Sequence, residues 1–197
     1  RDKIPYEIID GKERCIADEV PFEIPESWEW VRFETVTDML SGYAFKSEEY
    51  LSNGKFKLLR GINIGVNSIK WNDTVYINET TTNLEIYKLC TGDVLLGLDR
   101  PWISDGIRAV IYDQNDALLV QRVLRIRETK AIDKKYILTL LRSSMFKNAI
   151  EPDVTGISVP HISQKQVGAC LIPLPPLAEQ HRIVSKIEEL LPIISSI

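Results

Sequence analysis

The chain has 197 residues, of which 44% are hydrophobic and 26% charged, so it is long enough to bury a core and ordinary in composition for a globular protein. A formal net charge of −4 counts against a generic nucleic-acid binder, although affinity depends on where cations cluster. The three cysteines lack metal-ligand spacing, which predicts reduced thiols in a cytoplasmic protein. No apolar run reaches the length of a membrane span, so we expect no membrane association.

The N-terminal part of the chain divides into a polar stretch and an extended, proline-bounded stretch. Residues 1–20 are polar and weakly periodic, with Gly11 in a turn. We interpret them as a segment that approaches the folded domain, with disorder as the alternative. Residues 21–25 are extended, because each proline moves its predecessor out of the α region. Trp28 and Trp30 follow, and we interpret them as anchors of this segment, with an aromatic platform for bases as the alternative.

The middle of the chain alternates between strand-like runs and turns. A short helix over 33–40 is predicted because its apolar residues share one face. The predicted strands are 56–64, 75–77, 92–98, 107–112 and 118–126. Residues 113–116 indicate a hairpin between the last two. Asp133 is a candidate N-cap for a helix to about residue 150. A closing strand is expected from Val167. The pattern therefore predicts an α+β domain with a twisted, mainly antiparallel β-sheet core and one substantial packed helix at about 133–150.

The C-terminal stretch is organised by three prolines and a heptad pattern. Prolines 173, 175 and 176 forbid both a helix and a central strand, so the closing strand ends there and a helix departs after Leu177. Apolar residues then recur in alternating four- and three-residue steps, which is typical of a helix that packs along another helix. This partner-helix seam consists of Ile183, Ile187, Leu190 and Ile194, and continues at Ile197. Pro192 falls inside the pattern, which predicts a kink or local break.

No combination of residues predicts catalysis. Residues 128–130 offer Glu-x-Lys, but no Pro-Asp pair precedes them as in a metal-dependent nuclease. The glycine-rich turn of a nucleotide-binding site is missing from the sequence. His161 lies in a predicted loop and His181 in the first turn of the exit helix, and we find no Ser/His/Asp set that includes either. We therefore expect that the chain is not an enzyme and holds neither a metal nor a cofactor.

Cations and amides on predicted loops remain as candidates for binding DNA. Lys and Arg neutralise phosphates, whereas Arg, Asn, Gln and Ser address base edges, and loops on a rigid sheet can carry both. The loop 99–106 is the best candidate. The predicted DNA-binding residues are Lys46, Arg60, Asn63, Arg100, Trp102, Ser104, Arg108, Gln121, Arg122 and His161. For any single arginine the alternative is a solvated surface or ion pair, and for Gln121 and His161 it is a structural hydrogen bond.

Two stretches of the sequence resemble a known family. The residues IPLPPLAEQHRIVSKIEELL, which run from Ile172 to Leu191, resemble the junction between a target recognition domain and a spacer helix in specificity (S) subunits of type I restriction-modification systems. PFEIPESWEWVR, residues 21–32, resembles the start of such a domain. Residues 92–95 and 121–123 stand where the family usually has a Gly-Asp strand start and a Gln-containing strand. The resemblance covers almost the whole chain.

The resemblance implies a division of labour between subunits. A full S subunit holds two recognition domains separated by antiparallel helices, and each domain reads half of a split target in double-stranded DNA. Modification (M) subunits methylate adenine with S-adenosylmethionine, and restriction (R) subunits cleave with ATP and magnesium. This chain would supply the address without catalysis, and would pair with the second half of its own S subunit. Its N-terminal side favours the first recognition domain.

The corresponding domain bounds are an approach segment (residues 1–20), a target recognition domain (21–175) and the start of a spacer helix (176–197). An N-terminal Arg and a helical pattern that still runs at Ile197 suggest a piece of a longer chain. Two alternatives stay open. The chain could be a protein-interaction module that acts through its heptad helix, or the specificity part of a fused restriction-methyltransferase.

Overall fold

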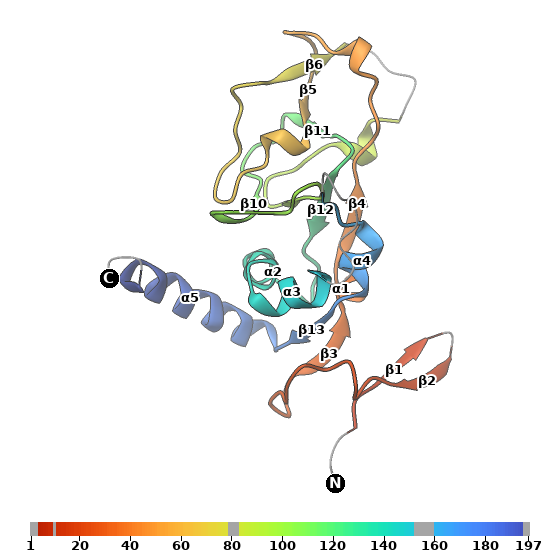
Figure 1. Cartoon of the computed structure of the whole chain (residues 1–197), viewed down its shortest axis with the longest axis vertical. Helices are drawn as coiled ribbons and strands as arrows, with labels where there is room; N and C mark the ends of the chain where they lie inside the picture. The colour runs from red at the N-terminus through yellow and green to blue at the C-terminus, as the bar shows by residue number, and fades with distance from the viewer. Residues whose placement is uncertain (1–3, 10, 79–82, 152–159, 195–197) are drawn as a thin grey trace.

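A β-hairpin precedes the main domain in the computed structural model, which describes residues 4–9, 11–78, 83–151 and 160–194. Strands β1 (Tyr6–Ile9) and β2 (Lys12–Cys15) pair antiparallel, and Gly11 takes a positive φ of 74° in the turn between them. Figure 1 shows this hairpin extending beyond β3. The described part of the N-terminal segment is thus folded, and the disorder alternative does not hold for it.

The centre of the domain is a four-stranded antiparallel sheet in the order β10-β7-β12-β4. Its strands are β4 (Asp38–Ser41), β7 (Val94–Gly97), β10 (Ala109–Ile111) and β12 (Val123–Arg127). Side chains alternate between the two faces of a strand, so Val94 and Leu96 of β7 enter one hydrophobic cluster and Leu95 enters another. All three are fully buried. The sheet is therefore a middle layer that is covered on both faces, as Figure 1 shows.

A second sheet, in the order β11-β5-β6, covers one of these faces. β5 (Phe56–Leu59) pairs antiparallel with β6 (Val75–Ile77) and parallel with β11 (Ala117–Leu119). The predicted hairpin through residues 113–116 is wrong, because β10 pairs with β7 while β11 joins β5. The predicted strand 118–126 is divided into β11 and β12 by a turn at Gln121 and Arg122, so residue 121 lies in a turn and not in a strand.

Helices cover the other face of the central sheet. α2 (Lys134–Leu141) begins as predicted, since the Asp133 side chain accepts hydrogen bonds from two backbone N–H groups of its first turn. The predicted helix 133–150 is nevertheless two helices. The Ser143 side chain accepts from the Phe146 N–H and thereby caps a new helix, α3 (Ser144–Ile150). The predicted helix 33–40 also ends early, as α1 (Phe33–Val36), because the residues that follow pair with β12 as strand β4.

The two ends of the domain meet in a small antiparallel pair. β3 (Glu29–Arg32) pairs with β13 (Leu171–Leu174). The predicted strand start at Val167 is wrong, because Ser163 and Gln166 form a capping box that begins helix α4 (Gln164–Ala169). Trp28 donates a hydrogen bond of 3.0 Å to Glu179, and the Trp30 ring lies 5.1 Å from that of Phe22, which supports the anchoring interpretation of both tryptophans.

Helix α5 (Leu177–Ile194) leaves the domain next to β13 (Figure 1). It begins where the prolines predicted, and it continues through Pro192, so no break occurs there. Gln180 and Val184 are buried against the domain, whereas the second half of the helix is exposed. Within the described part of the chain, no helix is long and apolar enough to cross a membrane. The predicted combination of an α+β domain, antiparallel sheets and a departing helix is confirmed.

Candidate nucleic-acid interface

A cleft of about 590 Å³ opens where three strands end. The loops after β5, β7 and β11 form its walls. β5 and β11 are parallel and so end at the same edge of their sheet, while the end of β7 lies opposite the start of β12 at the Val123–Gly97 pair. The residues that line the cleft are Tyr50, Arg60, Gly61, Ile62, Ile64, Gly65, Lys70, Asp99, Arg100, Ile103, Arg108, Val120, Gln121 and Arg122.

The cleft brings together predicted residues from distant parts of the sequence. Five of the ten line it, namely Arg60, Arg100, Arg108, Gln121 and Arg122. Arg60 thus shares one surface with Arg100, Arg108 and Arg122, which lie far from it in the sequence. Their contact with DNA stays a prediction, but the surface it requires is present.

Arg100 and Arg122 are exposed and have unusual backbone conformations. Their φ angles are 42° and 68°, and they are the two non-glycine residues with positive φ among those the structure describes. This conformation costs roughly 1–3 kcal/mol for a residue with a side chain, so the surrounding hydrogen bonds must enforce it. The Arg100 N–H donates to the Pro160 carbonyl at 2.6 Å, and the Arg122 carbonyl accepts from Leu98 at 2.9 Å. The strained turns hold both arginines at the cleft.

Arg60 forms part of the cleft wall, and its side chain contacts Asp73 and Tyr50. Its Nη2 donates to the Asp73 carbonyl and lies 3.1 Å from the Asp73 carboxylate. The guanidinium carbon lies 5.9 Å from the centre of the Tyr50 ring. Its Nε is buried without a hydrogen-bond partner among the described residues. Arg60 therefore lines the cleft with a guanidinium that Asp73 holds in place.

Asn63 and Arg108 hold the cleft loops from inside. Asn63 is 1% exposed, its amide oxygen accepts from the Arg60 N–H, and its amide nitrogen donates to the Lys70 carbonyl at 2.7 Å. The half-buried Arg108 donates to carbonyls of Gly61, Ile64 and Asp99. Burial lowers the pKa of the Arg108 guanidinium. The side chains of both residues thus hold the loops of the cleft together through hydrogen bonds to the backbone.

The other predicted residues lie outside the lining of the cleft. Lys46 is exposed just before the 3-10 turn Ser47–Glu49. Trp102 in β8 (Trp102–Ile103) packs 6.3 Å from Phe146, and Ser104 donates to the neighbouring Asp105 carboxylate in the turn before β9 (Gly106–Ile107). His161 forms an isolated bridge with Asp99, which places it behind the cleft wall.

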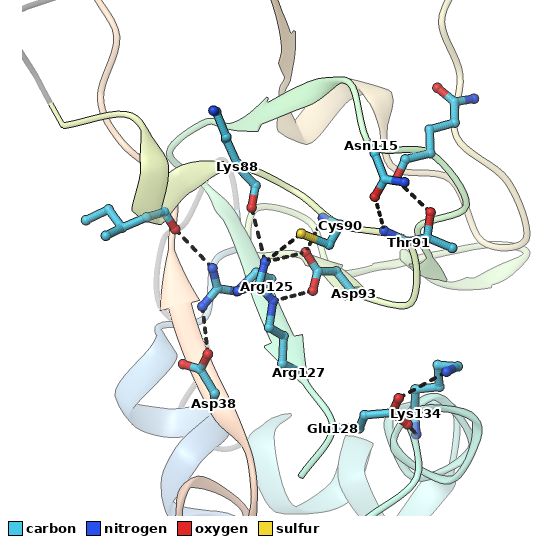
Figure 2. Close-up of polar contacts among 12 residues, drawn as sticks. Asp38, Lys88, Cys90, Thr91, Asp93, Asn115, Arg125, Arg127, Glu128 and Lys134 are labelled. Atoms are coloured by element: carbon cyan, nitrogen blue, oxygen red, sulfur yellow. Dashed lines mark hydrogen bonds and ion pairs between the residues drawn. The ribbon is translucent and has the colours of Figure 1, made fainter.

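Two arginines of β12 are tied up internally, as Figure 2 shows. Arg125 is 4% exposed and donates to the Asp38 carboxylate and the Ile86 carbonyl. Arg127 bonds both carboxylate oxygens of the buried Asp93, at 2.6 and 3.1 Å. Arg125 is on the face of β12 that packs against the second sheet, so its charge requires these partners and is unavailable to DNA.

Sequence reasoning missed several residues of the cleft. Ile62 and Ile103 are 62% and 42% exposed there, and Lys70 adds a cation. Lys70 lies on the same loop as Arg60, where its N–H donates to the Asn63 carbonyl at 2.8 Å and its own carbonyl accepts from the Asn63 side chain at 2.7 Å. Its positive charge was the one signal that could have identified it.

The predicted partner-helix seam on α5 is divided. Ile183 packs against the main hydrophobic cluster and Ile187 is half-buried, whereas Leu190 and Ile194 are 39% and 65% exposed. Ile197 lies outside the described residues. His181, on the outer side, is 3.6 Å from Asp133. The seam therefore contacts the domain with its first half and offers its second half to solvent.

A family model described as the type I restriction modification DNA specificity domain matches residues 25–196, and the chain belongs to this family. It is 40% identical over 178 residues to the specificity subunit of the type I restriction enzyme EcoAI from Escherichia coli, which covers 88% of this chain and 30% of that protein. It is 35% identical over 172 residues to the MjaVIII specificity subunit of Methanocaldococcus jannaschii, covering 85% and 40%.

The fold is shared with a solved specificity subunit. The crystal structure of the HsdS subunit from Thermoanaerobacter tengcongensis matches with a TM-score of 0.66 and 20% identity, over 89% of this chain and 40% of that one. The chain thus spans about 30–40% of the length of these relatives. The prediction that the chain belongs to the type I specificity-subunit family is confirmed by these matches.

Proposed function

We propose that this chain reads one half of a bipartite target in double-stranded DNA for a type I restriction-modification complex. The observation that carries the proposal is the cleft at the strand ends, where the exposed Arg100, Gln121 and Arg122 stand together. Concentrating cations at one edge explains how a chain with net charge −4 can still attract DNA, since local potential governs the encounter.

The residue types of the cleft suit both kinds of DNA contact. An arginine can donate two hydrogen bonds to guanine, and a glutamine can pair with adenine, through the major groove. Lys70 and Arg60, on the loop after β5, are placed to contact phosphates. Exposed Ile62 and Ile103 add apolar surface of the kind that contacts a thymine methyl group.

Helix α5 supports a role as a spacer that connects this domain to the rest of the complex. Its second half exposes apolar side chains, at positions 190, 191, 193 and 194. We expect them to pair with the second half of the S subunit and to dock the M subunits. In this proposal the M subunits supply S-adenosylmethionine chemistry and the R subunits supply ATP- and magnesium-dependent cleavage, so this chain needs no cofactor.

Methylation-site mapping with the full complex tests the proposal. Exchanging this domain for that of another specificity subunit should change one half of the modified sequence and leave the other half unchanged. If both halves stay the same, the proposal is wrong.

Substitutions of exposed cleft residues locate the interface. The double variant Arg100→Ala, Arg122→Ala should reduce modification of the mapped target at least about thirtyfold, because it removes two exposed guanidiniums worth roughly 1–3 kcal/mol each. Lys165→Ala, an exposed cation on α4, is the matched control and should modify normally. Equal activity of the double variant and the control would place the interface elsewhere.

A further inference from the structure

Arg108 joins two loops of the cleft through their backbones. Its Nε donates to the Ile64 carbonyl at 2.9 Å, its Nη1 to the Asp99 carbonyl at 2.7 Å, and its Nη2 to the Gly61 carbonyl. Gly61 and Ile64 belong to the loop after β5, whereas Asp99 belongs to the loop after β7. One guanidinium therefore fixes the distance between two segments that are far apart in the chain.

The loop after β5 is held at two further points. Asn63 closes it from within by donating to the Lys70 carbonyl at 2.7 Å. From the end of α2, Arg142 donates to the Val66 carbonyl at 2.8 Å and to the Ala109 carbonyl at 3.3 Å. The loop thus has a shape that is set before any ligand binds, and Arg108 is the contact that aligns it with the second loop.

The chemistry of Arg108 favours positioning over general stabilisation. Its three hydrogen bonds all go to backbone carbonyls, and burial lowers the pKa of its guanidinium even though the Asp99 charge opposes this shift. A charge that is desolvated onto neutral carbonyls costs free energy, and an apolar side chain of similar volume is often less costly. What the guanidinium provides, and an apolar group does not, is three hydrogen bonds in fixed directions.

We propose that Arg108 is a positioning residue that sets the sequence specificity of the cleft without touching DNA. It holds Arg60 and Arg100, which stand on the two loops that it joins, at a fixed separation. This inference rests on the proposed function. Base contacts need side chains placed within about 0.5 Å, whereas phosphate contacts tolerate movement. Loosening the two loops therefore reduces discrimination between sequences more than it reduces non-specific affinity.

The test compares Arg108→Gln, Arg108→Lys and Arg100→Ala in the full complex. The probes are the mapped target duplex, a series with one base pair changed at a time, and an unrelated duplex of equal length, each at several salt concentrations. We expect both Arg108 variants to lose about tenfold or more in discrimination at several base pairs, with an unchanged salt slope. Arg100→Ala should instead affect one base pair or lower the salt slope by about 1.

Several results would overturn the inference. A uniform loss of affinity with a smaller salt slope in Arg108→Gln, restored by Arg108→Lys, would identify a direct phosphate contact. Discrimination lost at a single base pair would identify a direct base contact. Should Arg108→Gln fail to fold, Arg108→Lys decides, and faster amide exchange in residues 61–65 and 98–100 without DNA should accompany its loss of discrimination. If the unmodified complex itself shows no preference for the mapped duplex, the proposed function fails instead.

Discussion

In both the cleft and the junction of helix α5 with the domain, one polar side chain forms hydrogen bonds to several backbone groups. In the cleft, Arg108 binds carbonyls of two loops. In the junction, Gln180 is 0% exposed and its amide nitrogen donates to the Ala131 and Pro175 carbonyls, at 2.8 and 2.9 Å. Its amide oxygen accepts from the Asp133 N–H at 2.9 Å. Each side chain joins backbone segments that lack a common sheet or helix.

The two regions differ in what surrounds the polar residue. Gln180 lies beside the main hydrophobic cluster, with Val184 one turn away and the Tyr136 hydroxyl donating to the Pro173 carbonyl at 2.8 Å. The cleft instead contains exposed arginines and two residues with strained backbone. The hydrogen bonds of Gln180, in an apolar environment, fix the direction in which helix α5 leaves the domain. Those of Arg108, beneath a charged surface, instead fix the relative positions of the loops that form the cleft.

Gln180→Ala should have the largest effect on stability. It leaves three backbone groups without their side-chain partner, of which the Pro175 carbonyl is buried, so we expect a loss of about 2–3 kcal/mol in the free energy of unfolding. Urea denaturation measures this loss, and the exposed Arg182→Ala on the same helix should change stability by less than about 0.5 kcal/mol. The target sequence should stay unchanged, in contrast to the Arg108 variants. A changed target with normal stability would contradict the comparison.

Arg122→Gly should act in the opposite sense. Glycine adopts positive φ without the steric cost that Arg122 bears at 68°, so we expect a gain of about 0.5–1 kcal/mol in the free energy of unfolding. Modification of the mapped target should fall, because the guanidinium is lost. The matched control is Arg182→Gly in the interior of α5, where the same substitution should destabilise by about 1 kcal/mol. A loss of stability in Arg122→Gly would show that the turn is not strained.

The smallest effect concerns the N-terminal hairpin, which is attached by ion pairs and lies outside both regions. A hydrogen bond from Arg32 lowers the pKa of Glu7 from its ordinary 4.5 to about 2. A carboxylate whose pKa is lowered by folding stabilises above its unfolded pKa, and this contribution is lost as the pH falls from about 4.5 to about 2. The ion pairs therefore hold the hairpin at neutral pH and release it in acid.

Amide exchange of β1 in the unmodified protein and in Glu7→Gln measures this attachment. Glu7→Gln should exchange faster at neutral pH, and the ratio between the two proteins should approach one as the pH falls through that range. The control is Glu13→Gln on the neighbouring strand, where we expect the same exchange rates as in the unmodified protein at every pH. A ratio independent of pH would show that Glu7 contributes little.

Local chemistry was enough to predict some elements and too little for others. Asp133 caps α2 as predicted, because an N-cap depends only on the adjacent turn. Ser143 is also a cap, but in an apolar periodic stretch the sequence does not show whether a serine starts a helix or sits inside one. The hairpin at 113–116 failed for a different reason. Turn residues permit a hairpin, but the strand that offers the better apolar partner decides the pairing, and here β11 pairs with β5.

The functional surface divides in the same way. The sequence by itself determined which residues are cationic, the approximate positions of β6, β7 and β10, and that a helix departs after the prolines near Leu177, since these depend on side-chain type and local periodicity. Only the tertiary structure decided which cations are available. Arg100 and Arg122 are exposed at the cleft, whereas the guanidiniums of Arg108 and Arg125 form hydrogen bonds to other groups of the domain. A charge must find partners wherever packing buries it, and burial is set by contacts between segments that are distant in the chain.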